Sequence, residues 1–414
     1  MNLSLDGAVD RIIAESNDIK KADANVQKAR AGLSAVNASR WPSISGTAAY
    51  VNIINVEAPG KPMEIIVPEM PMLGIPASVV PYPQHIGTLG ASATMPIYTF
   101  GKIGHAADAA RGAIKMAQSG NALARAEVRA AAAQIYWTAK MTDEMVVIAE
   151  KNLKASTSAK RQLERAGRAN KANLVKISAD IAAKEIALSD AEFNRDSAHR
   201  LLKIMAGIDD NEKLTLIDKF PNSYPSLDAP ETLVSNHEWD MLSENAQMYE
   251  SQSKSRRAAR LPTLAAMAQY DFTATHIEQQ VWDGNKEQAA NWGLALTMPI
   301  FDGGLSRANA TMDAMAAESA RQDLDKSKKL KSNEYRDAIL KHEHLRGNLS
   351  KLKEAHDLAD RAAKISMDRF TAGQTSAVEL SDVQASLAQM DLGVLNAKFN
   401  ILMAEESIKK LNGK

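Results

Sequence analysis

Apolar residues recur at two spacings along the chain, and the spacing changes at a proline. Residues 4–40 carry apolar side chains at about helical spacing among charged ones, which predicts a helix. This pattern stops at Trp41-Pro42, because the residue before a proline disfavours the α region. From Ser43 onward apolar and polar positions alternate, which predicts a strand with one apolar face.

The same order of elements occurs twice. Helices are expected over residues 4–40, 102–165, 171–206, 231–259 and 305–371, with a last helix that ends at about Leu411. Strands are expected from Ser43 to about Ile54 and over 86–97, 263–275 and 289–300. Residues 57–85 hold seven of the fourteen prolines, which predicts a long surface loop.

This order predicts a mainly α fold with a four-stranded β portion, built from a duplicated unit of β-hairpin and long helix. The expected segments are shorter helices at 1–40 and 231–260, a β-hairpin with a proline-rich loop at 41–100, a long helix with a turn and a return helix at 101–206, a linker at 207–230, a second β-hairpin at 261–301, and a second long helix with a turn and a return helix at 302–414.

Each hairpin ends in a similar joint. Thr94-Met95-Pro96-Ile97-Tyr98 is repeated as Thr297-Met298-Pro299-Ile300-Phe301, and glycine follows at Gly101 and at Gly303-Gly304. Proline supplies no N–H to a sheet ladder, and glycine permits a sharp turn. We therefore expect a strand to end and a helix to begin at each joint.

Charge is balanced over the whole chain but missing from the predicted strands. Lys and Arg total 50, as do Asp and Glu, so no nucleic-acid surface is indicated. Charged residues are absent from 41–56, 70–101, 261–270 and 288–301. The chain has no cysteine, which excludes disulfides and thiolate chemistry.

Four strands of about ten residues could not close a membrane barrel within one chain, since single-chain barrels begin near eight strands. An open sheet in lipid would leave its edge groups unpaired. The two longest predicted helices, at a rise of 1.5 Å per residue, would be about 96 to 100 Å long. Helices of this length cannot bury their apolar stripes within one compact protomer. We expect oligomerisation, in which three chains would supply twelve strands and the helices would pack into a tube.

Further motifs occur in a fixed order. Arg40-Trp41-Pro42 and Arg260-Leu261-Pro262 mark helix-to-strand corners, and the stretch from Arg369 to Ser376 is followed by Val378-Glu379-Leu380. Together with the two joints, these motifs resemble the TolC-like outer-membrane efflux protein family over nearly the whole chain. The resemblance implies a homotrimer, with a 12-stranded β-barrel in outer-membrane lipid that is continued by a tunnel of twelve α-helices across the periplasm.

The resemblance also implies a role and partners. A periplasmic adaptor (membrane fusion) protein would connect the channel to an inner-membrane RND or ABC transporter, as in tripartite efflux or type I secretion. Substrates would pass outward without chemistry, so no enzyme activity, cofactor or nucleic acid is expected. Met1 to Asp6 include neither a basic n-region nor an apolar h-region, so an exported form would already lack its signal peptide.

By the same resemblance, the turns at Ala166-Gly167 and Ala372-Gly373 are the periplasmic tips where the adaptor docks. Glu379 and Asp382 match inward-facing carboxylates just past the second tip. Three copies of each would form two anionic rings that favour cations. The alternative is that both are ordinary solvated charges on a helix face.

The tip also departs from the family pattern. Phe370, Thr375 and Asn173 match a tyrosine, an arginine and an aspartate that close the tip in the family's best-known member. Phe370 has no hydroxyl, and the other two carry no charge, so an aromatic constriction at Phe370 is expected instead. Lys176 is the first-repeat equivalent of Asp382 and could pair with that carboxylate or weaken the ring.

Other patterns are weaker. His342-Glu343-His344 with His356 lacks the His-Glu-x-x-His spacing of a zinc site, so we expect a solvated helix face and no metal. Trp292, Tyr98 and Phe301 fit either interfacial aromatics of a barrel or packing within the strands.

Two other protein classes have long helices. A soluble coiled-coil scaffold with a small β subdomain would explain the helices equally well, but not four uncharged alternating strands with paired joints. An adaptor protein would carry compact β and lipoyl-like modules beside a single hairpin, and the sequence shows no sign of them.

Overall fold

A computed structural model describes residues 1–52, 64–67, 78–81, 85–165, 171–227, 230, 232–276 and 285–413. The chain divides into two compact units. The helical unit comprises Met1–Gln27, Lys115–Glu244 and Ala320–Lys414, and the sheet unit comprises Lys28–Ile114 and Asn245–Ser319.

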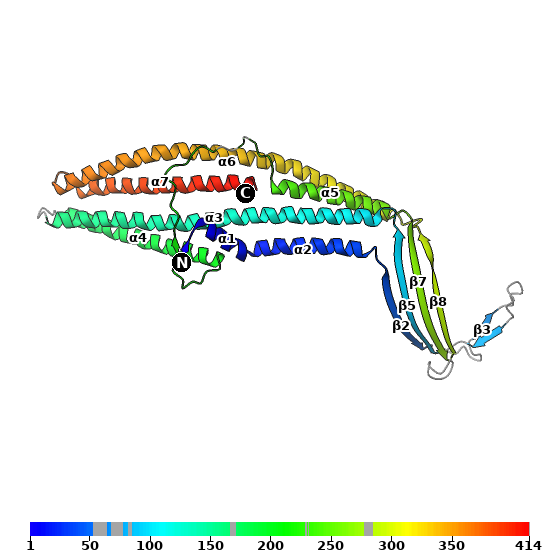
Figure 1. Cartoon of the computed structure of the whole chain (residues 1–414). Helices are drawn as coiled ribbons and strands as arrows, with labels where there is room; N and C mark the ends of the chain where they lie inside the picture. Colours follow the sequence, from blue (N-terminus) through cyan, green and yellow to red (C-terminus); the bar gives the residue numbers. More distant parts are fainter. Residues whose placement is uncertain are drawn as a thin grey trace. The chain divides into compact units, whose positions relative to one another are not determined.

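The secondary structure confirms the predicted mainly α fold with a four-stranded antiparallel sheet (Figure 1). The helices are α1 (Leu5–Glu15), α2 (Asn17–Ala38), α3 (Lys102–Arg165), α4 (Lys171–Met205), α5 (His237–Ala258), α6 (Leu305–Thr371) and α7 (Ala377–Leu411). The strands are β1 (Asn2–Leu3), β2 (Ser43–Asn52), β3 (Glu64–Val67), β4 (Ser78–Pro81), β5 (His85–Tyr98), β6 (Thr215–Leu216), β7 (Thr263–His276) and β8 (Asn285–Thr297). No helix within the described residues has the apolar length that a membrane span requires.

The main sheet of the sheet unit joins the two hairpins in the order β2-β5-β7-β8, and all its pairings are antiparallel. Among the described residues, β2 and β8 each pair on one side only. The backbone groups along the two outer edges are therefore free to pair with another strand.

Strand register gives this sheet one apolar and one polar face, since directly opposite residues project from the same side. One apolar row crosses all four strands: Ile44, Ala93, Ala268 and Trp292. The neighbouring row projects from the other side and is polar: Ser45, Ser92, Gln269 and Asn291. The apolar side is open to solvent in the single chain, because Ile44 is 79% exposed and Trp292 87%.

Two short strands, which the sequence did not indicate, lie within the surface loop expected at 57–85. β3 and β4 pair as a short antiparallel ribbon. The β-branched residues Ile65, Ile66 and Val67 suit a strand, and a proline at a strand end, such as Pro81, is tolerated. Residues 53–63, 68–77 and 82–84 lie outside the described part of the chain.

The two joints turn through glycine as predicted. The φ angles are 87° at Gly101, 63° at Gly303 and 87° at Gly304, a region that favours glycine. The strands end differently from the prediction, however. β5 passes Pro96 and continues to Tyr98, with a register shift between these two residues, because a bulge accommodates the residue that lacks an N–H.

At the second joint, β8 ends at Thr297, before Pro299 is reached. The carboxylate of Asp302 then accepts hydrogen bonds from the N–H groups of Gly304 and Ser306, each at 3.0 Å. These bonds satisfy backbone donors at the start of α6. Asp302 therefore acts as the cap that begins the long helix.

Two helix boundaries differ from the prediction because of capping side chains. The single helix expected at 4–40 is divided at Ser16 into α1 and α2, and the Ser16 hydroxyl accepts a hydrogen bond from the N–H of Ile19 at 3.4 Å. α5 begins at His237 instead of residue 231. The Asn236 side chain precedes it and accepts from the N–H of Glu238 at 2.9 Å, as an N-cap does.

The main core of the helical unit lies where the N-terminal segment, α3, α4, α6, α7 and the linker after α4 meet. We call it the central core, and its least exposed large side chains are Ile12, Tyr136, Leu202 and Ile401. β1 pairs with β6 in parallel and so joins the N-terminus to the linker. The Tyr136 hydroxyl donates to the Asp218 carboxylate at 2.6 Å. Burial, followed by this hydrogen bond, raises the pKa of Tyr136.

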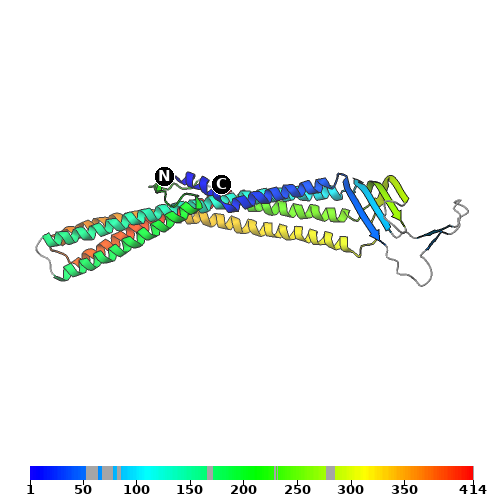
Figure 2. The same cartoon turned by 90° about the horizontal axis from the view of Figure 1, so that it is seen from below.

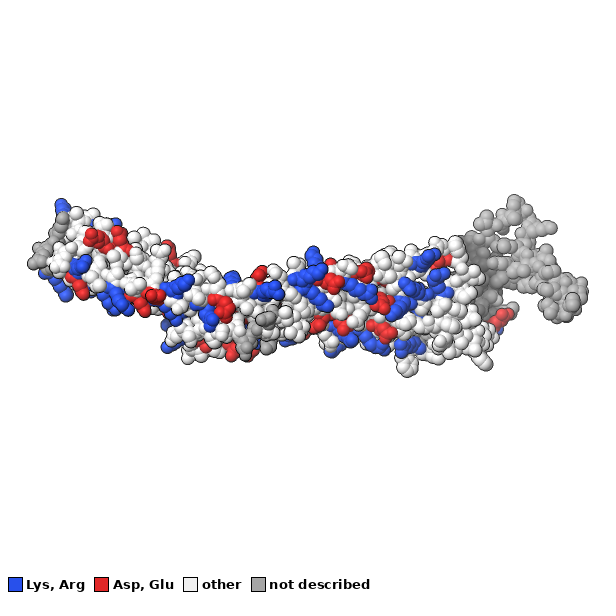
Figure 3. Space-filling view, turned by 90° about the horizontal axis from the view of Figure 1, so that it is seen from above, with Lys and Arg blue, Asp and Glu red and all other residues white. Residues whose placement is uncertain are grey.

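Charges of both signs lie side by side along the helices on the face shown in Figure 3. Some charges of the chain form ion pairs within one helix, such as Lys254 with Glu250 at 2.9 Å and Arg346 with Glu343 at 2.8 Å. This face has no extended field of one sign of the kind that binds nucleic acid.

Candidate functional site

The helical unit contains the two interhelical turns that the sequence marks as tips. α3 lies beside α4, and α6 lies beside α7, in both views (Figures 1 and 2). Ala166 and Gly167, in the turn between α3 and α4, lie outside the described residues.

The turn between α6 and α7 follows the predicted glycine geometry. Gly373 has a φ of 73°, a conformation that suits glycine after a helix C-terminus. Its N–H donates to the Phe370 carbonyl at 3.0 Å, and the N–H of Gln374 donates to the Arg369 carbonyl at 2.8 Å. Ala372 precedes this glycine and is exposed. The reversal of the chain at Ala372-Gly373 is confirmed.

Glu379 lies in the first turn of α7. Ser376 is the N-cap of this helix, and its hydroxyl accepts from the N–H of Glu379 at 3.2 Å. The hydroxyl of Thr375 donates to the Glu379 carboxylate. A carboxylate at this position is favoured by the helix dipole, so Glu379 has a local structural role, while its side chain stays exposed.

Asp382 follows one turn later on α7 and is exposed. Residues three apart on a helix lie on adjoining parts of one face, so the Glu379 and Asp382 carboxylates are neighbours. Lys176 is exposed in α4, and no ion pair joins it to Asp382 in the described structure. Asn173 is half-buried in the first turn of α4.

Phe370 lies in the tip, but its ring is not available to narrow a pore. It is 3% exposed and packs in a small apolar group that we call the tip cluster: Ala159, Leu163, Ile177, Phe370, Ala377 and Leu380. The cluster joins α3, α4, α6 and α7 within one chain. The aromatic constriction expected at Phe370 is therefore absent from this structure, because the ring has a packing site inside the protomer.

Next to the tip cluster lies a set of polar side chains that the sequence did not reveal. We call it the tip network, and its members come from α3, α4 and α7: Ser156, Asp180, Lys184, Ser381 and Gln384. The Asp180 carboxylate accepts from Ser156 at 2.7 Å, from Lys184 at 2.9 Å and from Ser381 at 2.9 Å. The Gln384 side-chain oxygen accepts from Ser156 at 3.0 Å and from Lys184 at 3.2 Å.

The tip network is largely shielded from water. Ser156 is 1% exposed and Gln384 9%. Burial raises the pKa of Asp180, but hydrogen bonds from Lys184 and Ser156 and the charge of Lys184 outweigh it, so the pKa lies below its ordinary value. The network therefore holds a charged carboxylate between three helices.

Helical spacing could have identified two members of the network. Ser156 is followed at helical intervals by buried Ala159 and Leu163, and Gln384 lies between buried Leu380 and Leu387. Polar residues in an apolar stripe need partners when they are buried. That pattern marks a buried polar contact, although it cannot name the partner.

His342 does not lie on a solvated helix face, which corrects the prediction. It is fully buried, and its Nε2 lies 3.2 Å from the Glu405 carboxylate of α7. The prediction was wrong because its sequence neighbours are charged, whereas His342 itself is on the side of α6 that packs on α7. His344 is exposed, and His356 contacts Asp391 at 2.8 Å. Within the described residues no three His, Asp or Glu side chains are grouped to hold a metal.

Comparisons with solved structures show the same fold at low identity. The chain matches CusC with 16% identity and a TM-score of 0.82, covering 99% of this chain and 92% of that one. It matches the Campylobacter jejuni CmeC outer membrane channel with 17% identity and a TM-score of 0.78, covering 99% and 85%. The Vibrio cholerae outer membrane protein VceC gives 16% identity and a TM-score of 0.76, covering 99% and 96%.

Sequence comparison supplies the family. Curated protein sequences give no match to the chain. The family model for outer membrane efflux proteins, in contrast, matches residues 8–207 and 231–414. These two ranges contain both hairpins, both joints and all four helices of the tip. The chain belongs to the outer membrane efflux protein family, as the sequence motifs predicted.

Proposed function

We propose that three copies of this outer membrane efflux channel protein close a 12-stranded barrel and continue it as a tunnel of twelve helices. The hairpins at 41–100 and 261–301 would form the barrel, and residues 101–206 and 302–414 the long tunnel helices. The shorter helices at 1–40 and 231–260 would complete the tunnel around the equatorial linker at 207–230. The assembly would be the exit duct of a tripartite efflux or type I secretion system.

The sheet carries this proposal. Its apolar face is exposed in the single chain, its opposite face is polar, and both outer edges lack a strand partner in the described structure. A membrane barrel needs lipid-facing apolar residues that alternate with lumen-facing polar ones, and it has no free edge. Closure by β2 and β8 of neighbouring copies would meet both requirements. A soluble coiled-coil scaffold would leave them unexplained.

The helical unit supports closure by copies of the same chain. On α4, Val175, Ile186, Phe193 and Ile204 are each at least 64% exposed. Their spacings of 11, 7 and 11 residues are close to whole helical turns, so they form one stripe. On α6, Leu340, Leu358 and Ile365 are at least 55% exposed and form a second stripe by the same reasoning. Pairing of unlike stripes on neighbouring copies would generate a ring.

The tip is the proposed docking end. The turns at Ala166-Gly167 and Ala372-Gly373 would contact the periplasmic adaptor protein, which would link the tunnel to an inner-membrane RND or ABC transporter. Glu379 and Asp382 would line the tunnel near its end, where three copies of each form anionic rings. The polarity of the tunnel near this end would be set by side chains close to the same turns: Thr375, Asn173 and Lys176.

A matched pair of substitutions on β8 tests the barrel. Leu294 belongs to the apolar face and Asn291 to the polar face. An arginine on a lipid-facing barrel position costs about 2–4 kcal/mol at the bilayer midplane, so Leu294→Arg should prevent recovery of trimers from outer membranes. Asn291→Arg should assemble and alter single-channel conductance in planar bilayers. A chain that is monomeric and extracted without detergent would contradict the proposal.

Disulfide cross-linking tests the pairing of the two stripes. The chain has no native cysteine. Ile186 and Leu358 lie about 22 Å and 20 Å along their helices from the ends that face the tips, at 1.5 Å per residue. Ile186→Cys with Leu358→Cys should give covalent trimers on oxidation, whereas either single variant should not. Cross-linking by the single variants alone would show that like stripes meet.

A further inference from the structure

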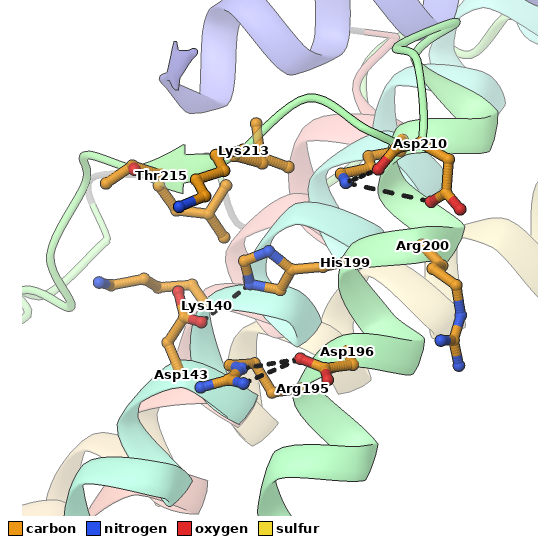
Figure 4. Close-up of a pocket in the computed structure, with 12 residues that line it drawn as sticks. Lys140, Asp143, Arg195, Asp196, His199, Arg200, Asp210, Lys213 and Thr215 are labelled. Atoms are coloured by element: carbon orange, nitrogen blue, oxygen red, sulfur yellow. Dashed lines mark hydrogen bonds and ion pairs between the residues drawn. The ribbon is translucent and has the colours of Figure 1, made fainter.

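A cavity of about 640 Å³ lies beside the C-terminal half of α4 in the helical unit (Figure 4). Its walls come from α3, from α4 and from the linker segment 210–216, which includes β6. Five of its lining side chains are cationic and three are carboxylates, so positive charge exceeds negative by two. Nothing in the channel function described above uses this cavity.

The carboxylates of the wall already have partners. Asp143 contacts Nε2 of His199 at 2.8 Å. Asp196 accepts two hydrogen bonds from the Arg195 guanidinium, at 2.9 and 3.0 Å. The Asp210 side chain is 77% exposed, and its carboxylate makes a loose contact with the Lys203 ammonium group, at 4.0 Å. The carboxylates are therefore not positioned to neutralise the remaining cations of the wall.

Two lysines of the wall have no ion pair with a carboxylate that lines the cavity. Lys213 forms no ion pair within the described part of the chain, and Lys140 has only an ion pair with Glu144 of its own helix at 3.4 Å. The Lys140 side chain is 13% exposed, so its ammonium group is held close to the wall. In Figure 4, Lys213 and Lys140 lie on two sides of the space next to the His199 ring, whereas Arg200 points away from it.

We propose that this cavity binds a small oxyanion with two negative charges, of the phosphate or dicarboxylate class. An ammonium group offers donors and no acceptor, and charge-assisted bonds to oxyanions are the stronger kind. A bound anion would bridge Lys140 of α3 and Lys213 of the linker, and so hold the linker against the helices. The proposal is independent of the barrel and the tunnel, since every residue that it needs lies in one protomer.

Isothermal titration of the purified full-length protein in detergent tests the site, with inorganic phosphate and succinate as separate probes at low ionic strength. Lys140→Gln and Lys213→Gln should each weaken binding about tenfold, since a hydrogen bond to a charged group contributes about 1.5 kcal/mol or more. Lys219→Gln is the matched control, because Lys219 is exposed on the same linker and does not line the cavity. Binding by Lys219→Gln should equal that of the unchanged protein.

The outcomes separate the sources of the anion. Binding of phosphate alone identifies a phosphate site, and binding of succinate as well identifies a general dianion site. The proposal is overturned if neither probe binds the unchanged protein, or if Lys213→Gln binds as tightly as the control. Lys213 is exposed on the linker, so this variant keeps the test decisive even if Lys140→Gln folds poorly. Channel conductance measured in parallel reports separately on the proposed function.

Discussion

The central core and the tip belong to the same helical unit but are held together differently. The central core buries side chains from six segments, and its large members include Ile12, Tyr136, Leu202 and Ile401. The tip cluster is much smaller, and the polar tip network beside it joins α3, α4 and α7 by hydrogen bonds. Apolar burial contributes about 25 cal/mol per Å², whereas a typical hydrogen bond adds only about 0.5–1.5 kcal/mol net. The tip should therefore open locally while the core stays folded.

The largest effect should come from the central core. Leu202→Ala removes a fully buried side chain of α4, and Leu→Ala in a packed core costs about 2–5 kcal/mol. We expect a cooperative loss of stability, measured as a lower midpoint of denaturant unfolding. Leu201→Ala is the matched control, because Leu201 is 50% exposed and surface substitutions usually change stability by less than about 0.5 kcal/mol. Equal effects of the two substitutions would show that the central core is not the main source of stability.

A smaller and more local effect is expected in the tip network. Lys184→Met keeps the length of the side chain but removes the donor to Asp180 and Gln384. Loss of a hydrogen bond to a charged group costs about 1.5–3 kcal/mol. Amide hydrogen exchange followed by mass spectrometry should therefore accelerate about 10- to 100-fold in the tip halves of α3, α4 and α7, with exchange around Leu202 unchanged.

Lys154→Met provides the control for this substitution, since Lys154 is exposed on α3 near the same region. It should leave exchange at the tip unaltered. If Lys184→Met instead lowered the stability of the whole helical unit as much as Leu202→Ala, the tip and the central core would form one cooperative unit.

Acidification should open the tip through Asp180. Its folded pKa is lowered because hydrogen bonds and the charge of Lys184 outweigh burial, whereas an unfolded aspartate titrates at about 3.9. The stability that this carboxylate contributes is thus present above about pH 4 and is lost as pH falls through the lower folded pKa. Hydrogen exchange at the tip should accelerate over that range. Asp180→Asn removes the titrating group and should flatten this response; an unchanged response would assign it to other carboxylates.

Much of the fold could be predicted because its signals are local and repeated. Glycine and proline mark the joints at Gly101 and Gly303, and alternation places Trp292 on the apolar side of the sheet, as strand register confirms. The β3–β4 ribbon was missed because strands of four residues between prolines are too short to show a period. The breaks at Ser16 and Asn236 depend on capping bonds that side chains make only in the folded chain.

The candidate site was less predictable because its contacts join distant parts of the chain. The glycine turn at Gly373 follows from sequence, but the burial of Phe370 depends on Ala159 and Ile177 of the other helical hairpin. His342 was placed in solvent because its neighbours are charged, whereas its partner Glu405 lies on the next helix. Helical period alone cannot show which face of a helix meets which neighbour.

The smallest effect on stability should come from the exposed carboxylates of the tip, where the effect on function would be greatest. Gln can still accept the hydrogen bond that Thr375 donates to Glu379, and Asp382 is exposed, so Glu379→Gln with Asp382→Asn should change stability by less than about 0.5 kcal/mol. In planar bilayers the double variant should lose much of its preference for cations, because the proposed anionic rings are neutralised. Glu164→Gln, an exposed change near the end of α3, should retain that preference. Unchanged selectivity in the double variant would instead make Glu379 a capping residue and Asp382 a solvated surface charge, and the tip would then differ from the central core in stability alone.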